Sequence, residues 1–302
     1  MLRLVISRLA VEDGEMTMVD DRKAMVMKAQ DADLESAFTV AGGVAEGKGK
    51  AGIGTLVLAD MLYVRGVSSP LAMSKERVQL APIRGKLAGG DVSGDLKLDL
   101  KKAAYTMGLE VKGASVDTLL KEAGSSRAMT GSLQAKGAFE GTGGLPTLKG
   151  RGSAEVRDCK LQKSPVMALL AGVLQLPELA DPSFDECRME FTIGGNRVQT
   201  PVLSLKGKAL QMTGKGAMSL ATSALDYDMD LALSQGLVER IGVKELRAAF
   251  KDRGDGFSTI AFKVTGTSER PQTDLASRIG KAAATQVLKD QAGKLFGKKK
   301  PF

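Results

Sequence analysis

Residues able to do chemistry are few, because the 302-residue sequence contains no histidine and only two cysteines, Cys159 and Cys187. Histidine is the commonest general base and metal ligand, so its absence excludes Ser-His-Asp and Cys-His catalysis and histidine-ligated zinc or haem. Two thiols cannot complete a four-cysteine metal site. We interpret both cysteines as buried thiols, with a disulfide in an oxidising compartment as the alternative. The sequence therefore predicts no catalytic residue, no metal and no cofactor.

Glycines near residue 47 resemble two kinds of phosphate-binding loop. Gly47, Gly49 and Gly52 spell G-x-G-x-x-G, and residues 42–48 spell G-x-x-x-x-G-K. The first motif requires a following helix whose N-terminus holds the phosphate, and the second requires Ser or Thr after the lysine to coordinate magnesium. Here Gly49 takes the Ser/Thr position, and the residues that follow are strand-like. We therefore predict a glycine-rich turn rather than a nucleotide site.

Three aspartates, Asp226, Asp228 and Asp230, resemble the start of a calcium-binding loop. Such a loop continues with Gly at its sixth position and a bidentate Glu at its twelfth, where this sequence has Leu231 and Leu237. The row is therefore interpreted as the solvated face of a strand. A pair of carboxylates for glycoside hydrolysis stays an open alternative, because the separation of two acids is a property of the fold.

Positive charge gathers at the carboxyl end of the chain. Lys plus Arg number 43 and Asp plus Glu 35, a net charge of +8 that favours anionic partners. Residues 274–296 follow helical periodicity, and two interpretations are open: a solubilising tail, or an amphipathic helix whose lysines contact anionic lipid headgroups. The candidate membrane-surface residues are Lys289, Lys294, Phe296, Lys298, Lys299 and Lys300. Nucleic acid is not an expected partner, because base stacking needs aromatic side chains near the cations and this chain has few.

The elements that must position any site are indicated by apolar and polar residues that alternate with period two, the pattern of a half-buried strand. The clearest run is 225–233, in which apolar residues alternate with the three aspartates. Further runs fall at 95–101, 105–113, 132–140, 188–195 and 257–266. The candidate groove residues are apolar members of these rows: Leu96, Leu98, Leu100, Met107, Leu109, Met189, Phe191, Leu225, Tyr227, Met229 and Leu231.

Glycine-bearing breaks between the runs predict hairpin turns at 89–90, 141–144, 194–195 and 254–256. Short helices are expected at 115–122 and at 164–176, the second with Ser164 at its N-cap and Pro165 at its first position. The predicted fold is mainly β: a long twisted antiparallel meander curled into a groove or half-barrel, with two short helices and a C-terminal amphipathic helix. We divide the chain into N-terminal β repeats (1–75), a β-groove region (76–270) and a basic helix and tail (271–302).

Degenerate motifs of glycine and apolar residues fill the second half of the chain. They are G-x-G-x-x-x-V-x-D-x-x-L at 150–161, S-F-x-x-x-x-x-x-F-x-I at 183–193, L-x-x-x-G-x-G-x-x-x-L at 210–220, L-D-Y-D-M-D-L at 225–231 and V-T-G-T-x-x-x-P at 264–271. Together they resemble the C-terminal region of the AsmA-like family of bacterial envelope proteins. Residues 76–112 match that pattern loosely, and residues 1–50 hardly at all.

The resemblance implies a long antiparallel sheet folded into a groove, in proteins anchored in the inner membrane and extending through the periplasm. Such proteins are associated with phospholipid movement and outer-membrane integrity. Members usually carry an N-terminal membrane helix, whereas this sequence has no run of about 20 apolar residues and opens with an apolar run too short for a signal peptide. A fragment, or a start codon placed too far downstream, would account for the difference. The implied localisation is periplasmic, in association with the inner membrane.

The length of the predicted strands also suits the binding of lipid acyl chains. Eight residues at about 3.3 Å each span about 26 Å, close to the ~30 Å hydrocarbon core of a bilayer. We therefore expect a non-enzymatic protein that binds phospholipid acyl chains along an apolar groove and supports outer-membrane biogenesis. Expected partners are phospholipids, an anionic membrane surface or envelope proteins, and further copies through edge-to-edge self-association. The alternatives are a closed β-sandwich scaffold without lipid and a carboxylate-based hydrolase.

Overall fold

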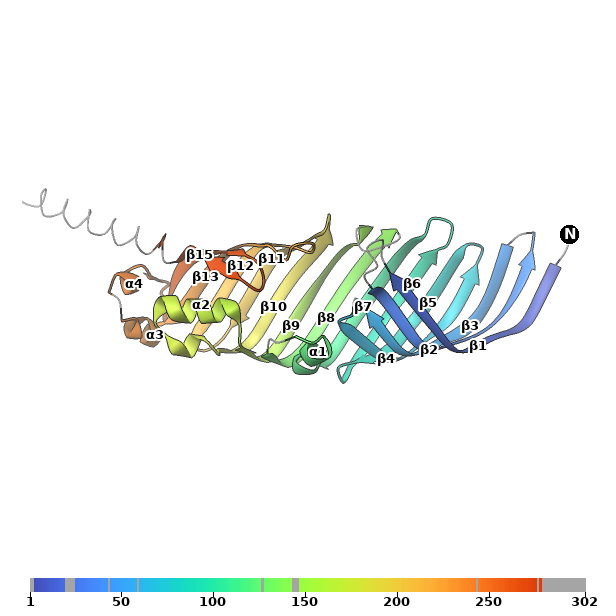
Figure 1. The fold of residues 1–302 in the computed structure, drawn as a ribbon, viewed down its shortest axis with the longest axis horizontal. Helices are drawn as coiled ribbons and strands as arrows, with labels where there is room; N and C mark the ends of the chain where they lie inside the picture. Colours follow the sequence, from blue (N-terminus) through green and yellow to red (C-terminus); the bar gives the residue numbers. More distant parts are fainter. Residues whose placement is uncertain are drawn as a thin grey trace, which may run out of the picture.

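A computed structural model describes residues 3–19, 25–42, 44–58, 60–125, 128–142, 147–242, 244–275 and 277–278. In this part of the chain, sixteen strands form one antiparallel sheet. Its order follows the sequence from β1 to β13, after which β15 separates β13 from β14 and β16 pairs with β15. The strands succeed one another along the long axis of the molecule (Figure 1). The predicted antiparallel meander is confirmed, and the sheet is not closed into a barrel.

The strands of the N-terminal half are β1 (Arg3–Val19), β2 (Met25–Ala41), β3 (Val44–Leu58), β4 (Leu62–Ser74), β5 (Arg77–Leu87), β6 (Gly90–Asp99), β7 (Ala104–Ser115) and β8 (Ala128–Thr142). Those of the C-terminal half are β9 (Lys149–Gln162), β10 (Ser183–Gly194), β11 (Arg197–Lys206), β12 (Leu210–Ser219), β13 (Leu225–Ser234), β14 (Lys251–Asp252), β15 (Phe257–Gly266) and β16 (Pro271–Thr273). The six predicted runs of alternation coincide with β6, β7, β8, β10, β13 and β15. The proposed boundary at residue 75 falls in the β4–β5 hairpin, within this continuous sheet.

Both predicted short helices form, and their first residues follow from local sequence. α1 (Val116–Glu122) begins after Ser115, whose hydroxyl accepts a hydrogen bond from the Thr118 amide. α2 (Pro165–Leu174) begins after Ser164, whose hydroxyl accepts one from the Met167 amide. The proline at its first position has no N–H, and an N–H there would have no partner within the helix.

The described residues also include a single 3-10 turn, η2 (Pro177–Leu179), which follows α2, and the short helices α3 (Gln235–Arg240) and α4 (Lys244–Ala248). Each is too short for sequence periodicity to reveal. The helix expected at 274–296 falls almost entirely outside the described residues.

The predicted turns at 89–90, 194–195 and 254–256 are confirmed, because Gly89, Gly195, Gly254 and Gly256 all have positive φ. The break predicted at 141–144 begins inside β8, which continues to Thr142, and the rest lies outside the described residues.

The predicted glycine-rich turn at 47–52 is wrong, since these residues lie inside β3, paired with both β2 and β4. A Cβ added at Gly47 would lie 2.5 Å from the Phe38 Cβ on β2. Glycine there permits close strand packing.

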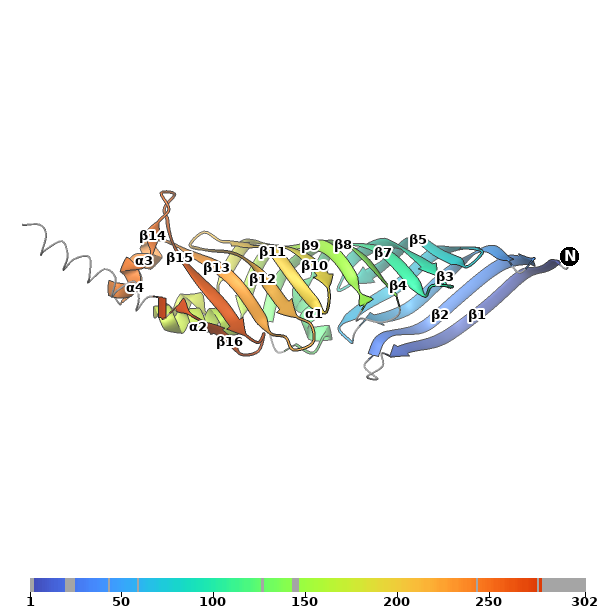
Figure 2. The same cartoon turned by 90° about the horizontal axis from the view of Figure 1, so that it is seen from above.

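The first two strands are long and bulged. The pairing of β1 with β2 shifts between Ile6 and Leu9 and again between Val11 and Gly14, because two residues of β1 face one residue of β2. Both strands bend along their length (Figure 2). Each bulge changes the phase of the alternation, so a strict period of two fails in this region.

The filled core lies at the C-terminal end of the sheet, where α2, α3 and α4 are found in both views (Figures 1 and 2). Leu170 and Leu174 of α2 belong to one buried cluster with Leu231 of β13 and Phe262 of β15. All four are almost inaccessible to solvent. The helices therefore cover the apolar face of β12, β13 and β15.

The rest of the sheet is open. The strands form one sheet in nearly sequential order, and its two end strands do not pair with each other. The closed sandwich with a filled core therefore does not describe this part of the chain.

Candidate apolar binding face

Cross-strand register aligns the apolar residues of β6 to β10 into rows across five strands. The rows are Val92, Val111, Ala135, Ala154 and Met189; then Gly94, Leu109, Gly137, Gly152 and Phe191; then Leu96, Met107, Phe139, Gly150 and Ile193. Leu98 continues the same face beside Tyr105. We call these three rows and the Leu98–Tyr105 pair the central apolar face. Six predicted groove residues lie on it: Leu96, Leu98, Met107, Leu109, Met189 and Phe191.

The large side chains of the central apolar face are half-buried, except Val92, which is buried. Half-burial results when side chains contact mainly neighbours within their own sheet, because most of the face has no other part of the described chain stacked on it. Among the described helices, α1 reaches this face, with Leu119 packed against the cluster that contains Val92. Most of the face is thus apolar and uncovered.

Glycines on the central apolar face lie under large side chains. A Cβ at Gly152 would lie 2.6 Å from Cζ of Phe191, and one at Gly137 would lie 2.6 Å from Cζ of Phe139. The rings therefore lie close over neighbouring backbone instead of standing upright. The result is a low apolar surface, which alternation alone does not reveal. The sequence signal for such a surface is glycine at inward-facing positions of successive strands.

Tyr105 is half-buried at one end of this face. Burial raises the pKa of its phenol above the ordinary value, and no nearby charge contributes to the shift. Its hydroxyl lies beside Gly141, where an added Cβ would be 2.6 Å from Oη.

The structure places the other five predicted groove residues elsewhere. Met229 is 5% exposed and Leu231 is 0% exposed, because both belong to the core that α2 covers. Leu225 and Tyr227 are half-buried against the same core. Leu100 lies beyond the end of β6 in the turn and is 57% exposed. None of these five residues is part of the central apolar face. The predicted membrane-surface residues, Lys289, Lys294, Phe296, Lys298, Lys299 and Lys300, lie outside the described residues.

A hydrogen bond between Thr200 and Tyr227 marks where the open face meets the core. Thr200 is almost fully buried in β11, and its hydroxyl lies 3.0 Å from the Tyr227 hydroxyl on β13. Tyr227 lies over Gly216 of β12, the strand between them.

We expect Thr200→Val and Tyr227→Phe each to lower the free energy of unfolding by about 1–2 kcal/mol, since each leaves the other hydroxyl without this bond. The double variant should lose little more than either single variant. Urea unfolding of the four proteins measures this. Fully additive losses would contradict a direct bond between the two hydroxyls.

The opposite face of the sheet is charged. Lys263 lies 3.1 Å from Asp228 and 4.0 Å from Asp226, and these aspartates hold the pKa of the lysine above its ordinary value. The predicted solvated strand face is confirmed.

Two hollows lie on the charged side of the sheet, one of about 1010 Å³ along β1 to β5 and one of about 300 Å³ along β7 to β10. Among the described residues, no group of three or more Cys, Asp and Glu could hold a metal ion.

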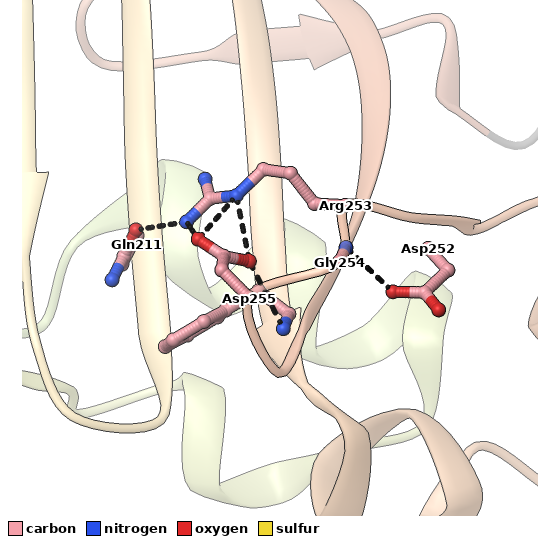
Figure 3. A network of polar contacts seen from close by, with 6 residues as sticks. Gln211, Asp252, Arg253, Gly254 and Asp255 are labelled. Atoms are coloured by element: carbon pink, nitrogen blue, oxygen red, sulfur yellow. Dashed lines mark hydrogen bonds and ion pairs between the residues drawn. The ribbon is translucent and has the colours of Figure 1, made fainter.

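A polar network holds the β14–β15 hairpin against the sheet (Figure 3). The Arg253 guanidinium donates to both carboxylate oxygens of Asp255, at 2.6 to 3.0 Å, and to Oε1 of Gln211 on β12 at 2.9 Å. Arg253 also lies over the Phe257 ring. These contacts are exposed and stabilise the turn, so they do not form a site.

Both cysteines are free thiols, Cys159 buried and Cys187 half-buried. A hydrogen bond to Cys159, together with burial, raises the pKa of Cys187 above its ordinary value. Cys187 is therefore protonated at neutral pH and is a poor nucleophile. The interpretation as a buried thiol is thus confirmed for Cys159, whereas Cys187 is only half-buried.

No match emerges when the chain is compared with models of protein families, with curated proteins or with solved structures. The resemblance to the AsmA-like family therefore stays a hypothesis based on the motifs. In the described part of the chain, no helix has the length and apolar character needed to cross a membrane.

Proposed function

We propose that this protein binds phospholipids, with their acyl chains along the central apolar face and without catalysing a reaction. One observation carries the proposal. Inward-facing apolar residues of β13 are buried because α2 covers them. Inward-facing apolar residues of β6 to β10 are mostly only half-buried, because no part of the described chain lies over most of that face. Large uncovered apolar patches on soluble folds are typical of ligand or partner sites.

The dimensions of the face suit an acyl chain. The strands that form it contain between 10 and 15 residues, which corresponds to about 33 to 50 Å at 3.3 Å per residue. A bilayer leaflet needs half of a ~30 Å hydrocarbon core. Each strand thus has room for one acyl chain along its length, held by many weak dispersion contacts rather than by one essential residue.

The cellular setting belongs to the same proposal. On the resemblance of its motifs to the AsmA-like family, we propose that it acts in the bacterial envelope, in the periplasm and close to the inner membrane, where it would support outer-membrane biogenesis. The net charge of +8 favours anionic headgroups. The basic residues at 289–300 would then contact the membrane surface while the sheet holds the lipid.

The test is a pair of adjacent substitutions that face opposite ways. Leu98→Glu places a carboxylate on the central apolar face, whereas Lys97→Glu places one on the charged face of the same strand. Replacing an apolar contact worth about 2 kcal/mol should weaken acyl-chain binding at least tenfold. We expect Leu98→Glu to lose co-purified phospholipid, measured by mass spectrometry of lipid extracts, while Lys97→Glu keeps it.

Circular dichroism must show the same β content in both variants. Equal phospholipid in two folded variants, or no phospholipid in the unaltered protein, would rule out the proposed function. In vitro uptake of a fluorescent phosphatidylglycerol from vesicles provides a second measurement that does not depend on the expression host.

A further inference from the structure

The first strand is an open edge of unusual length. β1 contains 17 residues and pairs with β2 on one side, and in the described chain no strand pairs with its other side. At the opposite end of the sheet the outer strands are short, two residues in β14 and three in β16. Natural sheets protect their edges with such short strands, whereas a long apolar edge invites pairing with another strand.

Several apolar side chains of β1 are exposed to solvent. Those on the face shared with the inward rows of β2 are Leu4, Leu9, Val11, Met16 and Met18, each between 40% and 52% exposed. Their partners on β2 are largely buried or half-buried. A strand added beside β1 would cover them.

Several features of β1 are placed symmetrically about Ala10, although Val5 and Ile6 correspond to Glu15 and Gly14. The two bulges of β1 fall at residues 7–8 and 12–13, at equal distances on either side. Arg8 and Glu12 also lie at equal distances from Ala10, on the charged face, where both line the larger hollow. A strand with this symmetry is complementary to an antiparallel copy of itself.

We propose that two copies of this chain pair through β1, antiparallel, with Ala10 on the two-fold axis. In this register Arg8 faces Glu12 of the second copy and the bulges coincide. Leu9 faces Val11 of the second copy and Leu4 faces its Met16, so these apolar residues meet on one face, and Arg8 meets Glu12 on the other.

A second copy explains the symmetry, whereas a strand from a different protein would have no reason to match it. The pairing joins two sheets into one, with the α2-covered ends outermost and the open apolar faces continuous through the centre. The inference stands without the proposed lipid function, because it rests on the register and charges of β1 alone.

Crosslinking tests the register. Ala10→Cys places two thiols at the axis, where directly opposed Cβ atoms lie about 4.5–5.5 Å apart, within reach of a disulfide. Thr17→Cys is the matched control, since the seven-residue offset from the axis separates the two thiols by about 46 Å. Under mild oxidation we expect a covalent dimer of Ala10→Cys on non-reducing gels. Thr17→Cys and the unaltered chain, with its two buried or half-buried cysteines, should stay monomeric.

Charge exchange tests the partner. Arg8→Glu and Glu12→Arg should each raise the dissociation constant of the dimer roughly tenfold, because two exposed ion pairs become repulsive contacts. The double variant Arg8→Glu with Glu12→Arg should restore it. Mixing the two single variants should produce a heterodimer. Glu35→Gln is the control, because it removes the ion pair with Arg8 within the chain and leaves the proposed contact intact.

Sedimentation equilibrium measures the dissociation constants. A chain that stays monomeric at all concentrations would overturn the proposal, and so would equal crosslinking of Ala10→Cys and Thr17→Cys. The proposal would also be overturned by a dimer whose dissociation constant is unchanged by both charge reversals and that forms no Ala10→Cys crosslink, because its interface would then lie on another surface.

Discussion

Replacing Met229 by glutamate should destabilise the protein by about 4 kcal/mol or more, the largest loss we expect from a single side chain. Met229 is 5% exposed in β13, in one cluster with α2 and β15. The described residues of this cluster are apolar, so they include no cation that would pair with the new carboxylate. The variant must either bury an uncompensated charge or separate the helix from the sheet.

Met107→Glu is the matched control, because it makes the same change on the same face of the sheet, six strands earlier in the chain. Met107 is half-buried and uncovered, so its carboxylate keeps contact with water. We expect it to lose only about 1 kcal/mol. Urea unfolding followed by circular dichroism compares the two variants. Equal losses would mean that α2 does not cover the face at β13, or that Met107 is covered as well.

This comparison also shows what the sequence could predict. Alternation assigned the inward face of β6, β7, β10 and β13 correctly, because the side-chain period of a strand is a local property. Ser115 and Ser164 marked both helix starts for the same reason. Which part of the face stays open depends on where α2 packs, and that contact joins segments distant in sequence. Met229 and Leu98 therefore look alike in the sequence and differ in the structure.

The N-terminal strands were the hardest to predict for a different reason. Bulges near Asp13 and Asp31, both with positive φ, change the phase of the alternation within β1 and β2. The glycines within residues 47–52 resembled a turn because glycine is common in turns. They lie inside β3, where neighbouring strands occupy the space that a side chain would need. A local pattern cannot separate these two uses of glycine.

The same distinction leads to the second large effect, at Gly216. An added Cβ there would lie 2.6 Å from the Tyr227 Cα and 2.6 Å from its ring on the neighbouring strand. Backbone cannot rotate away as a flexible side chain does, so β12 and β13 must separate. We expect Gly216→Val to lower the free energy of unfolding by about 3 kcal/mol and to disturb the Thr200–Tyr227 hydrogen bond.

Gly172→Ala is the control for Gly216→Val, and its effect should have the opposite sign. Gly172 lies within α2, has no heavy atom within 4 Å of an added Cβ, and is exposed. Alanine there should stabilise the protein by about 0.5–1 kcal/mol, because glycine loses more backbone entropy in a helix. Urea unfolding of both variants measures the sign of each change in the free energy of unfolding. A stable Gly216→Val protein would mean that β12 and β13 are not held in this register, and that the low glycine-lined surface of the sheet is not a packing requirement.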